Sequence, residues 1–326
     1  MSHCTANKKA ASAFVRRNSI PTTGAVAKAL FNSAIGIDVH HDILVCAYQY
    51  CNRESDEITT EVCSFGTTAS ELARFTDWCR NHHPEQILME STGVLWFSPY
   101  EALESVGFTN RQLSLINARD FKAIVGRKSD KQDAERLALY ARIGNVRSSF
   151  VPAKCFREMR AVSRLLSKTT DEQSRARSRY LKTLNFIGCR ASSVFSDVRG
   201  KAATAILEVL AEGTREQLID AIKIHGRRLR KSAAEILDAL DFAVSPAMAM
   251  QLRIQKQHME ALSQTCEELY ALLKVMQANY QPWINRLMTV PGIKERAARV
   301  IFAEVTNDLS SFPDAAHLAS WVGVCP

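Results

Sequence analysis

The spacing of apolar residues changes at Pro152, and this change constrains the fold of the chain more than any other feature of the sequence. Before Pro152, short runs rich in β-branched and aromatic residues alternate with segments of helical spacing. After it, the spacing is helical almost throughout. At 326 residues the chain is long enough for two or three domains with separate cores. We therefore expect an α/β domain followed by an all-α part.

Three short β-rich runs open the first part, and polar turns separate them. They are AIGIDV (residues 34–39), ILVCAYQY (43–50) and TTEVCSF (59–65). The segments that follow alternate: a helix at 70–82, a strand at 86–91, a helix at 95–107, a strand at 113–118, and helices at 120–124 and 130–144. This order predicts a mixed sheet flanked by helices, so we expect residues 34–150 to form one α/β domain.

The other segments differ in charge and in helical pattern. Residues 1–33 hold no acid and show no sustained periodicity, which predicts a basic disordered arm. Residues 151–245 are expected to form a basic helical region, and residues 246–280 a coiled-coil helix. Two rows of side chains at heptad spacing indicate the coiled coil: Leu252, Met259, Cys266 and Leu273, and Gln255, Leu262, Leu269 and Met276. The partner helix belongs either to the same chain or to a second subunit.

Residues 281–326 are expected to form a C-terminal domain that begins with a helix, a Pro-Gly hairpin and a second helix. Gly292 and Lys294 lie at this hairpin. Such a hairpin can offer backbone N–H groups at a helix N-terminus to a DNA phosphate. Many helix pairs use a Pro-Gly turn only to reverse direction, so both interpretations stay open.

The net charge of +8 is unevenly distributed along the chain. From Lys154 to Lys201 there are twelve Lys and Arg against four acids, and from Met1 to Phe31 five against none. Such a local surplus indicates a polyanionic partner, with a solvated helix face as the alternative. The candidate nucleic-acid-binding residues are Arg175, Arg177, Arg179 and Lys182, and a second cluster of Arg227, Arg228, Arg230 and Lys231.

Several classes of protein are not indicated. The nine cysteines occur singly, without a C-x-x-C pair or histidines at zinc-ligand spacing, so neither a disulfide framework nor a zinc site is expected. No apolar run approaches the roughly 20 residues that a membrane helix needs, and there is no signal peptide. We expect no membrane partner and a cytoplasmic location.

Four acids occur where they could share a site. Asp38 lies inside an apolar strand, where a carboxylate without a partner is costly, and Glu90 closes a second apolar strand. If these strands are neighbours, both acids reach the same edge of the sheet. Asp130 and Asp133 lie on one side of the helix at 130–144, which could pack across that edge. Taken alone, this pair is better explained by helix capping, because Asp is favoured near helix N-termini.

Four carboxylates with no cationic side chain among them would repel one another, and a bound divalent metal ion is the simplest way to offset this repulsion. Oxygen ligands favour Mg²⁺ or Mn²⁺ over zinc. Two such ions roughly 4 Å apart activate the attacking oxygen and stabilise the leaving oxygen of a phosphodiester. Arg127, Lys128 and Lys131 are then candidate phosphate contacts. His40 and His41 are better explained by a solvated turn than by a role in the site.

Five blocks of the sequence also carry a family resemblance. They are GIDVHHD, MESTGVLWFSPYEAL, NARDFKAIVGRKSDKQDAERLALYA, TVPGIKERAARVIFAEV and FPDAAHLASWVGVCP. In this order they resemble the bacterial insertion-sequence transposases with a RuvC-like DEDD domain, which are grouped as bridge-RNA-guided recombinases. The resemblance spans residues 34–326. By this resemblance the catalytic DEDD metal ligands are Asp38, Glu90, Asp130 and Asp133.

The resemblance implies an RNase H/RuvC-like mixed-sheet domain, a long helical or coiled-coil linker, and a helical C-terminal transposase domain with a helix-hairpin-helix-like element. The activity it implies is Mg²⁺- or Mn²⁺-dependent cleavage and transfer of DNA strands in transposition. The implied partners are DNA, a structured guide RNA that pairs with donor and target DNA, and further copies of the chain in a dimer or tetramer. The implied location is the bacterial cytoplasm.

The sequence departs from the family pattern near its C-terminal end. Family members carry a nucleophilic Ser in a short Ser-Gly motif a little beyond the segment that reads WVGVCP here. Ser320 lies before that point, so we do not transfer the role to it. The sequence therefore predicts a C-terminally truncated copy that is defective in strand exchange. The basic arm before the first strand is expected to be an addition from a displaced start codon.

Two other functions stay open from the sequence. A catalytically defective copy would act only as a DNA- and RNA-binding protein. An ATPase of the actin and sugar-kinase type would also have an Asp-containing turn after its first strand. That fold needs Gly-rich phosphate loops, whereas Asp38 is followed by Val-His-His and the chain has only 13 glycines.

Overall fold

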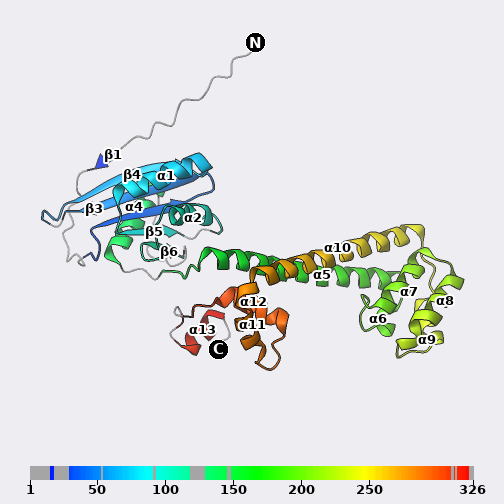
Figure 1. Cartoon of the computed structure of the whole chain (residues 1–326). Helices are drawn as coiled ribbons and strands as arrows, with labels where there is room; N and C mark the ends of the chain where they lie inside the picture. The colour runs from blue at the N-terminus through cyan, green and yellow to red at the C-terminus, as the bar shows by residue number, and fades with distance from the viewer. Residues whose placement is uncertain are drawn as a thin grey trace, which may run out of the picture. The chain divides into compact units, whose positions relative to one another are not determined.

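A computed structural model of the chain describes residues 15–17, 29–52, 54–90, 93–117, 129–144, 148–309, 312 and 314–322 (Figure 1). The chain divides after Pro152 into two compact units, Met1–Pro152 and Ala153–Pro326. Parts of the prediction lie outside the described residues, namely the helix at 120–124, the basic residues Arg127 and Lys128, and the segment 323–326.

The first unit is built on a six-stranded sheet in the order β1-β4-β3-β2-β5-β6. Its strands are β1 (Val15–Arg17), β2 (Ser33–Val39), β3 (Ile43–Cys51), β4 (Ile58–Gly66), β5 (Gln86–Glu90) and β6 (Leu113–Ile116). The strands β2, β3 and β4 pair antiparallel, whereas β5 pairs parallel with β2 and β6 parallel with β5. The β-rich runs and the two later strands thus form the mixed sheet that the sequence predicts.

The strand β1 lies within residues 1–33, for which the sequence predicts a disordered arm. It pairs antiparallel with β4, with Val15 opposite Val62 and Arg17 opposite Thr60. The outer edge of β4 would otherwise present unpaired N–H and C=O groups, which are a ready template for a further strand. Three residues without periodicity gave no signal from which this pairing could be predicted.

Helices cover both faces of the sheet. They are α1 (Ala69–His82), α2 (Phe97–Ser105) and α4 (Asp130–Ile143). Because successive strand residues point to opposite faces, Ile35 packs with Phe75 of α1, whereas its neighbour Ala34 packs with Leu137 of α4. The mixed sheet with helices on both faces is consistent with an RNase H-like fold, and the predicted fold class is confirmed.

Gly36 allows α4 to pack directly against β2. A Cβ atom at position 36 would overlap the carbonyl oxygen of Ala134 and the backbone nitrogen of Ala138. Both alanines are fully buried, so the backbones of the helix and the strand meet without intervening side chains. This close approach fixes the position of α4, whose first turn lies near the end of β2.

Two long helices, α5 (Lys154–Phe186) and α10 (Pro246–Met276), run antiparallel in the second unit (Figure 1). Thr183 of α5 contacts Gln251 of α10, and Thr170 contacts Cys266. The buried residues of α10 are the first of the two predicted rows: Leu252, Met259, Cys266 and Leu273. A partner helix for this row is therefore present in the same chain.

Shorter helices pack at the two ends of this pair. At one end lie α6 (Ala191–Val194), α7 (Lys201–Glu212), α8 (Arg215–His225), η1 (Gly226–Arg228) and α9 (Ala233–Leu240). At the other lie η2 (Ala278–Tyr280), α11 (Gln281–Met288), α12 (Glu295–Val305) and α13 (Ala315–Val322). Each end has a core of its own, the first around Leu184 and Ile206, the second around Phe156 and Phe302.

The turn between α11 and α12 matches the predicted Pro-Gly hairpin. Gly292 has a φ of 89°, in the left-handed region where glycine meets no steric penalty. Across the described residues, no helix is both long enough and apolar enough to cross a membrane.

Candidate metal centre

Asp38 and Glu90 lie at neighbouring positions of two parallel strands. In the register of β2 and β5, Ile37 is opposite Met89, and the two acids follow directly. Side chains at equivalent positions of adjacent strands point to the same face, and Ala34 and Gly36 show that this face is the one α4 covers. Each acid is only 6% exposed. Two carboxylates are thus buried side by side at one edge of the sheet.

The first turn of α4 carries the other two acids to the same edge. Ser129 occupies the N-cap position of α4, so neither Asp130 nor Asp133 is the cap residue. The side chain of Ser129 makes no capping hydrogen bond. The side chain of Asp133 is 13% exposed, whereas that of Asp130 is 65% exposed. The capping explanation therefore does not account for Asp133, which the helix turns inward.

His40 links the strand to the helix. Its Nε2 atom lies 3.0 Å from Oδ2 of Asp38 and 3.8 Å from Oδ1 of Asp130. These three residues each offer a ligand atom, and the three atoms lie within 4.8 Å of one another, close enough to share one cation. His40 lies in the predicted turn between β2 and β3, where its N–H donates to the carbonyl of Ile43, and its side chain is 41% exposed. Its ring nevertheless contacts Asp38, which the interpretation as a solvated turn does not predict. His41 lies in the same turn and makes no contact with Asp38 among the described interactions, and its side chain is 83% exposed.

The carboxylate of Asp38 interacts electrostatically with its charged neighbours. Burial raises the pKa of Asp38 above its ordinary value, the ion pair with His40 lowers it, and the carboxylates of Glu90 and Asp133 raise it again. Asp130 reaches the same place through its contact with His40. The structure thus brings together the four predicted acids, which we call the acidic cluster: Asp38, Glu90, Asp130 and Asp133.

The acidic cluster fits a divalent metal ion. A carboxylate that is buried beside other carboxylates needs a cation, and oxygen donors are those that Mg²⁺ and Mn²⁺ prefer. One cation is already close, because Nη1 of Arg136 lies 3.5 Å from Oδ1 of Asp133. The sequence interpretation that the cluster contains no cationic side chain is therefore wrong. It overlooks pairing between residues three apart along a helix.

The basic residues predicted near the cluster are only partly described. Lys131 is exposed in the first turn of α4, next to Asp130 in the sequence, and makes no ion pair with any residue that the structure describes. Arg127 and Lys128 precede the described part of this helix.

The predicted nucleic-acid contacts on α5 are not equivalent. Arg175, Arg179 and Lys182 are exposed, and none makes an ion pair within the part of the chain that the structure describes. Arg177 instead pairs with Asp197, with 3.5 Å between Nη2 and Oδ1. Three of the four side chains therefore keep an uncompensated charge at the surface.

The remaining predicted contacts also differ in charge compensation. Arg227 and Arg230 are exposed, whereas Lys231 pairs with Glu235 at 3.2 Å, and the side chain of Arg228 is outside the described part. Gly292 is exposed in the hairpin, and Lys294 is the exposed N-cap residue of α12.

Two family models match the chain. Residues 35–188 match the DEDD domain of the IS110 transposases, a family described as transposase, and residues 284–326 match the transposase IS116/IS110/IS902 family. Among solved structures, the chain is similar to RuvC from Thermus thermophilus, with 16% sequence identity over 36% of this chain and 99% of that chain, and a TM-score of 0.25. No curated protein matches the chain. The first match contains the whole acidic cluster, and the second contains the hairpin between α11 and α12.

Proposed function

The chain belongs to the IS116/IS110/IS902 family of transposases, and from this premise we propose that it cleaves and transfers DNA strands with divalent metal ions bound at the acidic cluster. The residues that would hold Mg²⁺ or Mn²⁺ are Asp38, Glu90, Asp130 and Asp133. When bound, a pair of such ions supplies activation of the attacking oxygen and stabilisation of the leaving oxygen of a phosphodiester.

The protein residues have separate tasks in this proposal. Asp38 and Glu90 lie in the sheet, which gives their carboxylates a rigid support. His40 donates a hydrogen bond from its Nε2 to the Asp38 carboxylate, which fixes the orientation of that carboxylate. Arg136 does the same for Asp133 on α4. The side chain of Asp130 is more exposed than those of Asp38 and Asp133, so Asp130 would face the side from which nucleic acid enters.

One observation carries the proposal: two acids on β2 and β5 and two acids on α4 meet, although 95 residues separate the first from the last. The preference of Asp for helix N-termini explains why Asp130 and Asp133 begin α4, but it does not explain why they lie near Asp38 and Glu90. Nor does packing explain it, since burial of the Asp38 carboxylate beside Glu90 and Asp133 is unfavourable and the contact with His40 offsets it only in part.

We extend the proposal to the partners that the family resemblance implies. These are DNA, a structured guide RNA, and further copies of the chain in a dimer or tetramer. Arg175, Arg179 and Lys182 support a nucleic-acid partner, because uncompensated cations on one helix can replace the counterions of phosphates. Arg177 and Lys231 contribute less, because acids already compensate their charges.

The test is a strand-cleavage assay with purified full-length protein, Mg²⁺, the RNA of the element and DNA from the element ends. We expect nicking or joining of strands, and Asp38→Asn should abolish it while the protein still binds DNA. The matched control is Asp42→Asn, because Asp42 lies four residues further on, is 88% exposed and stands outside the acidic cluster. Cleavage that survives Asp38→Asn would refute the metal site. Binding without cleavage by the wild type would favour the alternative function of a DNA- and RNA-binding protein.

A further inference from the structure

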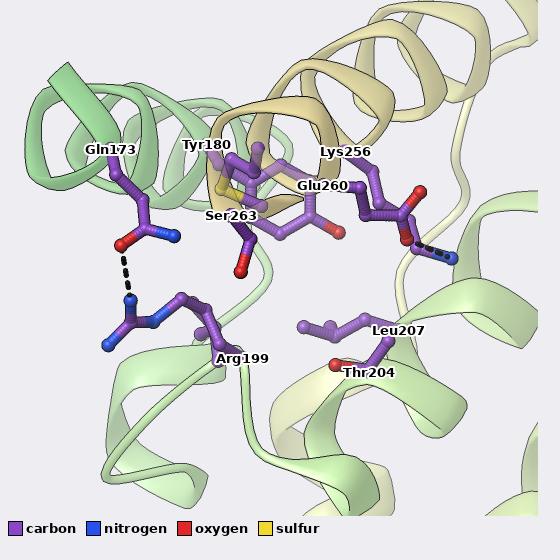
Figure 2. A pocket seen from close by; sticks show the side chains of 10 residues that line it. Gln173, Tyr180, Arg199, Thr204, Leu207, Lys256, Glu260 and Ser263 are labelled. Carbon is purple, nitrogen blue, oxygen red and sulfur yellow. Dashed lines mark hydrogen bonds and ion pairs between the residues drawn. The ribbon is translucent and has the colours of Figure 1, made fainter. Parts of the chain in front are cut away.

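The second unit contains a cavity that the acidic cluster and the predicted basic surface leave unexplained. It has a volume of about 250 Å³ and lies between α5, α7 and α10 (Figure 2). A second cavity of about 250 Å³ continues from it along α10. Both are lined by the same four residues, Tyr180, Leu207, Lys256 and Glu260, so they form one groove with two compartments.

The first compartment has an apolar floor. Val198, Leu207 and Met259 line it, together with the ring of Tyr180, and each of these side chains is at least nine-tenths buried. A surface of this kind favours a flat, apolar ring over a hydrated ion.

Tyr180 places a polar atom within this apolar floor. The residue is 4% exposed, yet its hydroxyl makes no hydrogen bond to any residue that the structure describes, and it points toward the space beside Lys256 and Glu260 (Figure 2). Burial raises the pKa of Tyr180 to about 12, so the hydroxyl stays protonated at neutral pH and can both donate and accept a hydrogen bond. A hydroxyl that opens onto a cavity and has no protein partner can bind a ligand or an ordered water.

The polar rim of the first compartment is nearly neutral. Arg199 donates a hydrogen bond to Gln173 across the mouth (Figure 2) and pairs with Asp197. Lys256 pairs with Glu208 and Glu260. Asp197 also pairs with Arg177, whereas two acids flank Lys256, so three cations lie among three acids and the compartment itself does not select an anion. The amide of Gln173, with Ser263 and Thr204 on the wall, instead offers hydrogen bonds to the edge of a neutral ring.

The second compartment is lined by Arg253 in addition to Lys256, and by Glu208 and Glu260, the two acids that pair with Lys256. Arg253 lines it and is exposed, and its guanidinium makes no ion pair within the described part of the chain. Arg253 lies one helical turn from Lys256 on α10, so an anionic group bound there would lie next to a ring bound in the first compartment.

From this arrangement we infer that the groove is a nucleotide-binding site, which takes a nucleobase against Tyr180 and the phosphate at Arg253. A nucleobase combines apolar faces with a polar edge, and unpaired bases are recognised by contact with an aromatic ring and hydrogen bonds to that edge. The nucleotide comes either from a bound nucleic acid, as an extruded unpaired residue, or from free mononucleotide. Only the first source rests on the proposed function.

Two probes test the site with full-length protein. The first is a single-stranded DNA dodecamer of adenines with one central 2-aminopurine, whose emission reports the environment of that base. The second is adenosine 5′-monophosphate, titrated by calorimetry. We expect a saturable change in 2-aminopurine emission that Tyr180→Phe weakens about two- to tenfold in affinity, as the loss of one hydrogen bond predicts. Ser263→Phe should abolish it, because a phenyl group would fill the first compartment.

The matched control is Gln264→Phe, at the next and exposed position of α10. Equal responses of Ser263→Phe and Gln264→Phe would overturn the proposal, as would unchanged affinity in Tyr180→Phe, which removes one atom and preserves packing. If adenosine 5′-monophosphate binds, and Tyr180→Phe and Ser263→Phe weaken its binding as they weaken the 2-aminopurine response, the site takes a free nucleotide. If only the dodecamer gives a response, the site takes an extruded residue of a nucleic acid. Asp38→Asn separates the two proposals, because it should remove strand cleavage and leave the 2-aminopurine response intact.

Discussion

Substitution of Gly36 by Ala tests whether the packing of α4 on β2 positions the acidic cluster. The added Cβ would overlap two backbone atoms, the Ala134 carbonyl oxygen and the Ala138 nitrogen, and neither can rotate away as a side chain could. The helix must therefore move as a body. Overpacking of a core costs about 1–3 kcal/mol. At about 2–4 °C per kcal/mol for a domain of this size, the melting temperature of the first unit should fall by about 2–12 °C.

The same displacement should also weaken metal binding, because α4 carries Asp130 and Asp133 while Asp38 stays on β2. Thermal unfolding followed by circular dichroism, and Mn²⁺ titration of the folded protein, measure the two effects. Gly66→Ala is the control, because its Cβ would meet the flexible Glu71 side chain at 3.1 Å and no backbone atom closer than 3.9 Å. A Gly36→Ala protein that melts and binds Mn²⁺ like the wild type would refute the reasoning.

Two further predictions concern charge. Because burial raises the pKa of Asp38, the stability that its proton confers is present below about pH 4 and is lost as pH rises through the raised pKa. Without metal at pH 7, the Asp38→Asn protein should therefore have a higher melting temperature than the wild type, and its stability should decrease less as the pH rises. A lower melting temperature of the Asp38→Asn protein in calorimetry would contradict this. Replacement of Arg175, Arg179 and Lys182 by Ala should reduce the salt dependence of duplex DNA binding, by about 0.9 in the logarithmic slope for each phosphate that these side chains neutralise in the wild type. Fluorescence anisotropy at several salt concentrations measures the slope, and an unchanged slope would mean that this face of α5 does not bind DNA.

The sequence predicts the sheet well because its signals are local. The β-rich composition of residues 34–39 and 43–50 is recognised without knowledge of distant contacts, and the acid that interrupts an apolar strand is unusual in any context. The placement of Asp130 and Asp133 follows only if α4 crosses the sheet near Asp38. That crossing depends on Gly36, which lets α4 approach β2 closely. The glycine is visible in the sequence, but the sequence does not show that α4 is the helix that packs against it.

The features that the sequence does not predict depend on tertiary contacts. His40 reaches Asp38 because a turn folds its ring back, and a histidine two residues beyond a strand gives no such signal by itself. Arg177 looks equivalent to Arg175 along the chain, yet Asp197 from a later loop compensates it. The groove at Tyr180 is formed by residues from three helices, and no spacing along one segment indicates it.

The most direct test of the central claim is calorimetric titration of Mn²⁺ into the purified wild type, Asp38→Asn and Asp42→Asn proteins. The claim is that the carboxylates of β2, β5 and α4 form one metal-binding site. We expect saturable binding by the wild type and by Asp42→Asn, and loss of that binding in Asp38→Asn. Equal binding by all three proteins, or no binding by the wild type at millimolar Mn²⁺, would contradict the claim.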